Sequence, residues 1–211
     1  MLMTVEYFIV ENERTARRFL RSVGYSKNFA EVGFQKLERD EDFEERTELI
    51  DYLTSGKIAA VMSEAGCPGI ADPGAAVARW AHQSGIAVVP VVGPSSIFLA
   101  LMASGLNGQQ FAFHGYLPIE SATRKIKIRQ LEEDSLLKNQ TQIFIETPYR
   151  NDGLVKDMLS VCRSPTELCI ASDITLPSEN IRLQTIAEWK KNGPNLKKKP
   201  TIFLLLSRKK V

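Results

Sequence analysis

Two apolar runs that flank an amphipathic helix constrain the fold of this chain more than any other feature. Residues 58–62 and 86–92 are continuously apolar, and between them Val77, Trp80 and Ala81 recur at helical spacing. Strands that are apolar at every position are typical of parallel sheets covered by helices on both faces. The first half of the chain therefore predicts an α/β domain built on a parallel sheet.

The alternation of strands and helices continues through the rest of the chain. Asn12 is the expected cap of a first helix, and a helix from Ser95 should turn Ile97, Leu101 and Met102 inward. Further apolar runs predict strands at residues 7–10, 111–116, 142–145, 168–171 and 202–206. A glycine-containing break after the Ser95 helix separates two expected α/β domains, residues 1–107 and 108–211.

Composition and charge exclude several classes of protein. The 211 residues include 27 basic and 25 acidic side chains, a net charge of +2, which predicts no broad nucleic-acid-binding surface. Cys67, Cys162 and Cys169 are odd in number and match no disulfide or zinc spacing, so we expect packed thiols in a reducing cytoplasm. No apolar run approaches the roughly 18 residues that a membrane span needs, and no signal peptide is recognisable. We therefore expect a cytoplasmic protein without a membrane segment.

Loops that contain glycine or proline follow three of the predicted strands. In open α/β sheets, ligands bind at the carboxyl ends of the strands, and glycines there let backbone amides approach the ligand. The first loop is Ser63-Glu64-Ala65-Gly66-Cys67-Pro68-Gly69-Ile70-Ala71-Asp72-Pro73-Gly74. Within it, Asp72 has a simpler explanation as the N-cap of the next helix, with Pro73 in the first turn of that helix.

The second and third loops are shorter. They are Gly93-Pro94-Ser95-Ser96 and Glu146-Thr147-Pro148-Tyr149-Arg150. Either serine could cap the helix that follows, or the N-terminus of that helix could face an anionic group. Three such loops favour a shared binding cleft. Because the sequence contains no serine–histidine–acid set, HExxH or CxxC motif, it favours neither a hydrolase nor a bound metal.

The ordered set of motifs resembles the tetrapyrrole-methylase family. It consists of Ser63-Glu64-Ala65-Gly66-x-Pro68, Asp72-Pro73-Gly74, Gly93-Pro94-Ser95, Gly115-Tyr116-Leu117-Pro118 and Glu146-Thr147-Pro148-Tyr149-Arg150. The set is most similar to the branch of the family that methylates a ribose 2′-hydroxyl of small-subunit ribosomal RNA. The resemblance implies a two-domain α/β fold in which the family's first strand is missing, and such a loss would leave a sheet edge open.

The resemblance also implies a cofactor and partners. S-adenosylmethionine would be folded into the cleft between the domains, the subunit would form homodimers, and the small ribosomal subunit or its RNA would be the substrate. The residues that would hold the cofactor are Ser63, Glu64, Ala65, Gly66, Pro68, Asp72, Pro73, Gly74, Gly93, Pro94, Ser95, Ser96, Ile145, Glu146, Thr147, Pro200 and Thr201.

Two departures from the RNA branch keep other functions open. The basic pair of that branch is absent from residues 172–176, and Tyr149 replaces its usual histidine. One alternative is methylation of a tetrapyrrole or another small metabolite. The other is a non-catalytic descendant that binds the cofactor or a partner but transfers nothing.

The candidate catalytic groups are carboxylates. Methyl transfer from a sulfonium is an in-line displacement in which the enzyme mainly aligns the acceptor, and a ribose hydroxyl would also benefit from a base. Glu146 or Glu11 could orient the acceptor, although Glu146 could instead pair structurally with Arg150.

Basic residues that could contact RNA phosphates, or form a solvated face, are Arg124, Lys125, Lys127 and Arg129 on one predicted helix and Lys197, Lys198 and Lys199 near the C-terminus.

Overall fold

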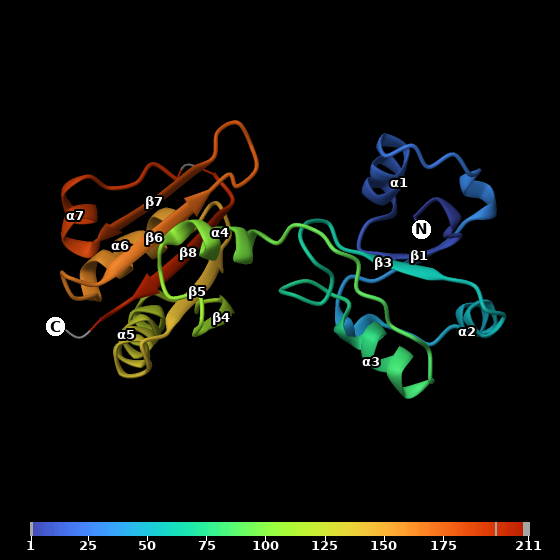
Figure 1. Ribbon diagram of the computed structural model, residues 1–211, viewed down its shortest axis with the longest axis horizontal. Coiled ribbons are helices and arrows are strands. Elements are labelled where there is room, and N and C mark those ends of the chain that lie inside the picture. Colours follow the sequence, from blue (N-terminus) through green and yellow to red (C-terminus); the bar gives the residue numbers. More distant parts are fainter. Residues whose placement is uncertain (1, 197, 209–211) are drawn as a thin grey trace. The chain divides into compact units, whose positions relative to one another are not determined.

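The computed structural model describes residues 2–196 and 198–208, and its contacts divide the chain into two units, Met1–Pro94 and Ser95–Val211 (Figure 1). This division lies before helix α4 (Ser96–Ser104), whereas the glycine-containing break in the sequence predicts a boundary after that helix, at residue 107. Helix α4 groups with the second unit because it packs against the sheet of that unit.

The first unit is built on a small parallel sheet. Its elements are a 3-10 turn (Leu2–Thr4), β1 (Tyr7–Val10), α1 (Glu13–Ser22), a 3-10 turn (Phe29–Glu31), β2 (Gly33–Lys36), a 3-10 turn (Asp40–Asp42), α2 (Thr47–Thr54), β3 (Ala59–Met62) and α3 (Ala75–Gln83). The strand order is β2-β1-β3, and both pairings are parallel. Among the described residues, β2 and β3 are therefore the edge strands of this sheet.

Strand β1 is central to this unit because its side chains alternate between two cores. Phe8 packs with Leu20 of α1 on one face, and Ile9 packs with Leu49 of α2 and Trp80 of α3 on the other. Each of these side chains is at least nine-tenths buried, and burial of one such side chain contributes roughly 1.5–3 kcal/mol. The parallel sheet predicted for the first half of the chain is confirmed.

Helix α1 begins where the sequence predicted. The Asn12 side-chain oxygen accepts hydrogen bonds from Arg14 N at 3.0 Å and from Thr15 N at 3.3 Å. These bonds satisfy two of the amide groups that have no partner inside the first turn of a helix. The predicted N-cap is confirmed.

The second apolar run, residues 86–92, is not a strand. Ile86 packs against the core, but Val89, Val91 and Val92 are 63%, 74% and 102% exposed. The predicted strand was wrong because apolar side chains make a strand only where a neighbouring strand accepts its backbone hydrogen bonds.

The second unit contains a larger mixed sheet. After α4 its elements are β4 (Phe111–Tyr116), α5 (Ser121–Lys138), β5 (Thr141–Glu146), α6 (Asn151–Val161), β6 (Glu167–Ser172), β7 (Asn180–Thr185), α7 (Ile186–Lys191) and β8 (Thr201–Leu206). The strand order is β4-β5-β8-β6-β7; the β4–β5 pair is parallel and the other pairs are antiparallel. The last strand in the sequence is therefore the middle strand of the sheet.

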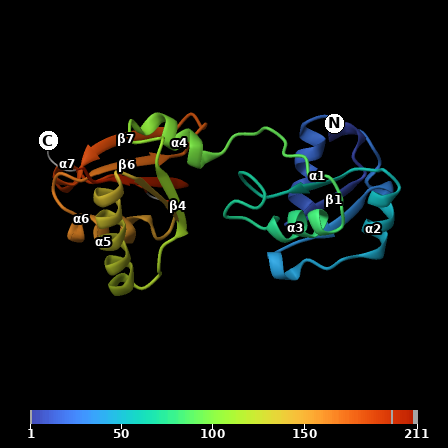
Figure 2. The ribbon, with the colours of Figure 1, turned by 60° about the horizontal axis from the view of Figure 1, so that its bottom comes forward.

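Helices cover both faces of this sheet (Figure 2). On β8, Phe203 and Leu205 point into a core shared with α5, α6 and α7, whereas Ile202 and Leu204 point into a core shared with α4. This alternation explains why β8 is apolar at five consecutive positions, since neither face of the strand meets water.

Helix α4 buries most but not all of its predicted face. Ile97 and Leu101 are buried, whereas Met102 is 80% exposed, so its predicted inward orientation was wrong. Ser95 occupies the N-cap position, but its side chain makes no capping hydrogen bond. The helix ends at Gly105, whose φ of +71° suits a glycine at that position.

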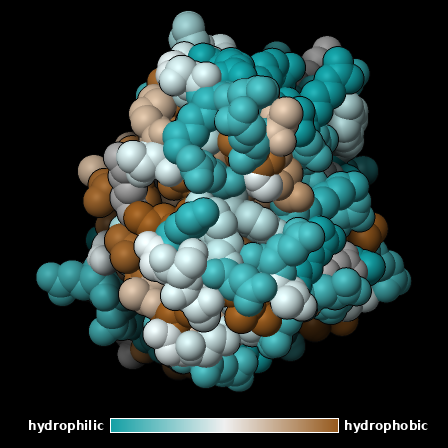
Figure 3. Space-filling view, turned by 90° about the vertical axis from the view of Figure 1, so that its right-hand side faces the viewer, coloured by the Kyte–Doolittle hydropathy of each residue, from teal (hydrophilic) through white to brown (hydrophobic). Residues whose placement is uncertain are grey.

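Among the residues that the structure describes, no helix is long and apolar enough to cross a membrane. The face seen in Figure 3 is mostly hydrophilic, with apolar side chains in small groups.

Candidate functional site

The loop at residues 63–74 is held by close backbone contacts. Gly69 N donates to Pro73 O at 3.1 Å, and a β-carbon added to Gly74 would lie 3.0 Å from Gly69 N. Gly74 has a φ of +140°, and its amide donates to Asp40 Oδ1 at 2.7 Å. Conformation and space therefore both require glycine at position 74.

Asp72 is not the cap of helix α3. Gly74 occupies the N-cap position, so Pro73 precedes the helix instead of lying in its first turn. The predicted cap was wrong because the loop continues two residues further. Asp72 is half-buried, and its burial, followed by the negative charge of Glu11, raises the pKa of its carboxyl above the ordinary range.

Hydrogen bonds join the loop after β3 to Glu11 and Thr15, which follow β1. Glu11 Oε1 accepts a hydrogen bond from Glu64 N at 2.8 Å, and Thr15 Oγ1 donates to Glu64 Oε1. Next to them Gly66 is exposed, with a φ of +80° and no atom within 4 Å of the position of a β-carbon. The backbone of the loop is therefore open to a ligand at this point.

The predicted cofactor residues divide between the two units. Those in the first unit are Ser63, Glu64, Ala65, Gly66, Pro68, Asp72, Pro73, Gly74, Gly93 and Pro94. Those in the second unit are Ser95, Ser96, Ile145, Glu146, Thr147, Pro200 and Thr201. Within the first unit, Cys67 Sγ lies 3.9 Å from Pro94 O, so the first and second loops meet there.

In the second unit, strand pairing brings together predicted residues that lie far apart in the sequence. Glu146 at the end of β5 is opposite Thr201 at the start of β8, and Thr201 is also opposite Ser172 of β6. Pro200 O accepts a hydrogen bond from Asp173 N at 3.0 Å. We call this group of residues the sheet-end site: Glu146, Thr147, Arg150, Asn151, Ser172, Pro200 and Thr201.

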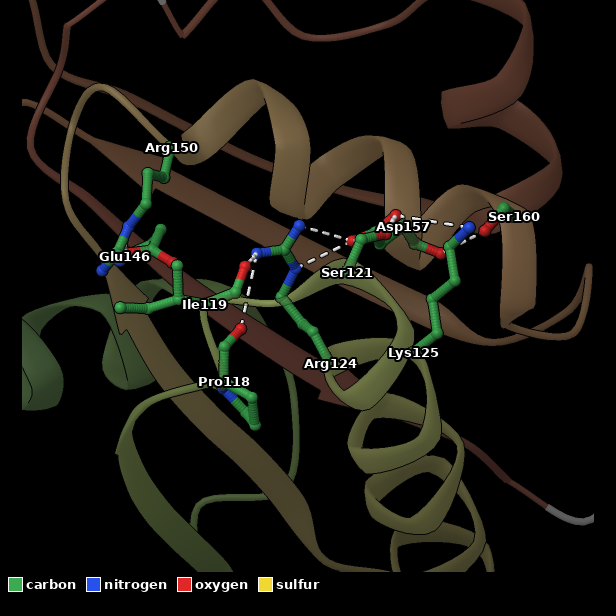
Figure 4. A network of polar contacts seen from close by, with 9 residues as sticks. All are labelled: Pro118, Ile119, Ser121, Arg124, Lys125, Glu146, Arg150, Asp157 and Ser160. Atoms are coloured by element: carbon green, nitrogen blue, oxygen red, sulfur yellow. Dashed lines mark hydrogen bonds and ion pairs between the residues drawn. The ribbon is translucent and has the colours of Figure 1, made fainter.

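Glu146 is fully buried at the sheet-end site, and only one of its oxygens is paired. Oε1 accepts hydrogen bonds from Thr147 N at 2.6 Å and Arg150 Nε at 2.8 Å, and lies 2.6 Å from a second guanidinium nitrogen of Arg150 (Figure 4). Oε2 has no hydrogen-bond partner among the described residues. The structural ion pair with Arg150 is confirmed, and a buried acceptor without a partner costs free energy in the folded protein.

Asn151 is a site residue that sequence reasoning missed. Its side-chain nitrogen donates to Lys199 O at 2.8 Å and to Thr201 Oγ1 at 3.2 Å, and the side chain is completely buried. Its Oδ1 has no partner among the described residues. The position follows the Glu146–Arg150 motif directly, but an asparagine at the start of a helix predicts a cap and gives no sign of a long-range contact.

Two of the four basic residues on helix α5 that could contact RNA or form a solvated face pair with one carboxylate of α6, and Arg124 is the buried one of the two. Arg124 is buried and bonds Asp157 of α6 at 2.5 and 2.8 Å as well as the Ile119 carbonyl at 2.8 Å (Figure 4). Lys125 lies 3.6 Å from the same carboxylate. Arg124 is therefore a clamp between α5, α6 and the loop before α5, which contradicts both the phosphate contact and the solvated position considered for it. Arg129 is exposed.

The lysines near the C-terminus differ from one another. Lys199 Nζ pairs with Asp173 Oδ2 at 2.9 Å, whereas Lys198 Nζ lies 5.7 Å from the centre of the Tyr149 ring. Hydrogen bonding to Lys199, together with a bond from Ser178, outweighs the desolvation of Asp173 and lowers the pKa of its carboxyl. Lys197 lies outside the described residues.

The two cysteines of the second unit are packing residues. Cys162 and Cys169 are buried, and burial raises the pKa of each thiol to about 12. Such thiols are not ionised near neutral pH and are poor nucleophiles. Among the residues that the structure describes, no group of three or more histidine, cysteine or acidic side chains is arranged to hold a metal ion.

A family model described as tetrapyrrole (corrin/porphyrin) methylases matches residues 1–190. The chain belongs to the tetrapyrrole methylase family. This methylase chain is 34% identical over 209 residues to a protein of Vibrio cholerae named ribosomal RNA small subunit methyltransferase I, covering 97% of the chain and 69% of that relative. It is 30% identical to a protein of the same name from Haemophilus influenzae, covering 98% of the chain and 71% of that relative.

Solved structures agree with the methylase fold. The methyltransferase CobJ aligns with a TM-score of 0.58 at 15% identity, over 96% of this chain and 83% of that one. The uroporphyrin-III-C-methyltransferase of Thermus thermophilus aligns with a TM-score of 0.52 at 18% identity, over 97% of this chain and 84% of that one. At such identities the likeness shows the fold alone, and the two-domain α/β fold predicted from the motifs is confirmed.

Proposed function

We propose that this chain transfers a methyl group from S-adenosylmethionine to a ribose 2′-hydroxyl of small-subunit ribosomal RNA. The observation that carries the proposal is the similarity, at 34% and 30% identity over nearly the whole chain, to two relatives that are both named ribosomal RNA small subunit methyltransferase I. The resemblance adds a cytoplasmic location and a homodimeric state to the proposal.

The residues of the predicted loops fit this cofactor. S-adenosylmethionine carries amino and hydroxyl groups that donate hydrogen bonds, and Asn151 Oδ1 and Glu146 Oε2 are buried acceptors without a partner among the described residues. The open backbone around Gly66 provides amide and carbonyl groups for the polar edges of the cofactor. We assign cofactor binding to these positions together with the other loop residues named above.

The chain's own contribution to the chemistry is alignment. When bound, the cofactor supplies an electrophilic methyl group on a sulfonium, which an acceptor oxygen attacks in line. Holding the ribose hydroxyl in that line can account for roughly 7–11 kcal/mol in favourable systems. We assign the orienting role to Glu146, because Oε1 is fixed by Thr147 and Arg150 while Oε2 is free to accept the hydroxyl proton.

The single unpaired oxygen of Glu146 serves either the acceptor hydroxyl or an amino group of the cofactor. The variant Glu146→Gln distinguishes the two, since it keeps the shape of the side chain and removes the charge. If the oxygen orients the acceptor, turnover falls by about 100-fold while the dissociation constant for S-adenosylmethionine stays unchanged. If it binds the cofactor, the dissociation constant rises. Full turnover by the variant would exclude the orienting role.

Cofactor binding is the first experiment. Calorimetric titration with S-adenosylmethionine and S-adenosylhomocysteine should give micromolar binding with about one site per subunit, typical of an enzyme's working range. A chain that is folded but binds neither compound would argue against methyl transfer. Folding is checked on the same sample by thermal unfolding.

The acceptor is tested with radiolabelled S-adenosylmethionine. Unmodified small ribosomal subunits, the free RNA of those subunits and a tetrapyrrole are offered in parallel. Label in RNA that makes one phosphodiester bond resistant to alkali identifies a 2′-O-methyl group. Label only in the tetrapyrrole would support the second candidate, which the missing basic pair at residues 172–176 favours.

A further inference from the structure

An exposed aromatic ring lies on the turn that carries Thr147 and Arg150 of the sheet-end site. Tyr149 lies between β5 and α6 and is 80% exposed, and Lys198 Nζ is 5.7 Å from the centre of its ring. Lys198 forms no ion pair with another described residue, so its charge is available. We call Tyr149 and Lys198 the stacking platform. An exposed aromatic residue alone is ordinary, and what distinguishes this one is how firmly its surroundings are held.

The turn that carries Tyr149 is fixed from within. Arg150 N donates to Thr147 O at 2.9 Å, which closes the turn around Tyr149. The buried Glu146 carboxylate then holds both sides of the turn, through Thr147 N at 2.6 Å and Arg150 Nε at 2.8 Å. Hydrogen bonds to a buried charge are among the stronger ones in proteins, so the ring projects from a rigid base.

The segment that carries Lys198 is tied to the same turn. Asn151 donates to Lys199 O at 2.8 Å, and Thr201 Oγ1 donates to the same carbonyl at 2.9 Å. The Lys199 ammonium is held by Asp173 at 2.9 Å. Lys198 itself adopts a φ of +55°, a conformation that non-glycine residues rarely take. Polar contacts thus hold the backbone on either side of the ring and next to Lys198.

A rigid exposed ring beside a free ammonium matches single-stranded nucleic acid. Aromatic side chains stack on unpaired bases, and a lysine beside the ring can meet the adjacent phosphate. Other exposed apolar side chains of the second unit, such as Leu137 at 73%, have no cation described over them. Tyr149 also lies three residues from Glu146, so a stacked base would be placed next to the carboxylate that orients the acceptor.

We propose that Tyr149 and Lys198 form a stacking platform that holds an unpaired base and its phosphate in the RNA substrate, next to the sheet-end site. The inference rests on the proposed function and adds to it how the RNA is positioned. Tyr149 is a positioning residue in this proposal, because the ring holds the nucleotide and takes no part in bond making.

The test measures binding of a short, fluorescein-labelled single-stranded oligoribonucleotide and methylation of purified small ribosomal subunits. The variant Tyr149→Ala should bind the oligonucleotide about tenfold more weakly and raise KM for the subunits, with little change in kcat. Tyr149→Phe keeps the ring and should stay within about twofold of wild type. Lys198→Gln should lower the slope of log affinity against log salt by about 0.7, the loss of one phosphate contact on a single strand.

Matched controls separate this role from a general defect. Leu137→Ala removes another exposed apolar side chain, and Lys190→Gln removes another exposed cation; both should behave as wild type. Calorimetric titration with S-adenosylmethionine should give the same dissociation constant for every variant. Wild-type protein that methylates RNA while Tyr149→Ala matches it in KM and affinity would overturn the platform and leave the proposed function standing. Wild-type protein that binds the cofactor but neither binds nor methylates RNA would overturn both.

Discussion

Arg124 shows how a single charged residue can be placed wrongly by a helix pattern. It lies in a run of basic residues that predicts a solvated or RNA-facing side of α5, yet it is buried against Asp157. Burial by itself would raise the pKa of the Asp157 carboxyl, but hydrogen bonds from Ser121 and Arg124, with the charge of Arg124, outweigh it and lower the pKa. The pair therefore stabilises the folded state while the carboxyl is ionised.

Breaking this pair should destabilise the second unit strongly. Arg124→Met keeps the apolar stem but leaves the Asp157 charge buried without its partner, so the free energy of unfolding should fall by about 3–5 kcal/mol. Urea unfolding at neutral pH measures the change. Arg129→Met on the same helix is the control; because Arg129 is exposed, it should change the free energy by less than about 0.5 kcal/mol. Equal effects of the two substitutions would contradict the buried clamp.

The Arg124–Asp157 pair should make the free energy of unfolding depend on pH in the acidic range. Because the folded pKa of Asp157 lies below its unfolded value of roughly 3.9, its contribution is present above that value and is lost as the pH falls through the folded pKa. The difference in unfolding free energy between wild type and Asp157→Asn should therefore shrink as the pH is lowered below about 4. Urea titrations across that range test this, and a difference independent of pH would show that the ionised form is not favoured by folding.

At the scale of elements, runs of apolar residues predicted strands correctly where a neighbouring strand is present. The ranges 7–10 and 111–116 match the buried β1 and the half-buried β4. The continuous apolar run of β8 indicates a strand buried on both faces. Strand β2 was missed because Gly33, Gln35 and Lys36 leave it with one apolar side chain. Strand β7 lies at a sheet edge and alternates polar with apolar residues, a weaker signal.

Part of the candidate site could also be predicted from the local sequence. Glycine or proline after an apolar strand marks a loop locally, so the residues 63–74 and 146–150 could be found. That Glu146 lies opposite Thr201, and that Asn151 reaches Lys199, depends on the pairing of β5 with β8. Nothing in the local sequence encodes the register between strands that are separated by two helices and two other strands.

The run at residues 86–92 gives a test at this scale. Val92 is 102% exposed, so Val92→Ser should change the free energy of unfolding by less than about 0.5 kcal/mol. Val10, 2% exposed in β1, is the matched control, and Val10→Ser should cost at least about 2 kcal/mol. Chemical denaturation compares the two. A comparable loss at both positions would show that residues 86–92 are packed as a strand in solution.

At the scale of the whole molecule, the chain has separate cores on either side of residue 94. The first unit holds two small cores around β1, and the second unit holds two larger ones around β8, each made of residues from that unit alone. A unit that has its own core and a sheet covered on both faces is expected to fold without the rest of the chain. Each unit contains at least one cysteine, so thiol labelling can follow the unfolding of each unit.

Thiol labelling should report on the two units separately. Cys67 is half-buried in a loop of the first unit, while Cys162 and Cys169 are buried in the second, where the pKa of each thiol is raised to about 12. In the native chain a disulfide reagent should therefore label one thiol quickly and the other two only when the second unit opens. Labelling is followed by absorbance, and the modified cysteines are identified by peptide mass.

A polypeptide of residues 95–211 extends this prediction. It keeps the five strands β4 to β8 and the helices on both faces, so it should unfold cooperatively and protect Cys162 and Cys169 as strongly as the full chain does. The same fragment carrying Arg124→Met is the matched control. Loss of the contact between Arg124 and Asp157 lowers the free energy of unfolding of the fragment, so both thiols should be labelled faster, in proportion to the larger unfolded population. If the thiols of the unsubstituted fragment reacted at the rate of the unfolded chain, the second unit would need the first unit in order to fold. The two units divided at residue 94 would then not be independently stable.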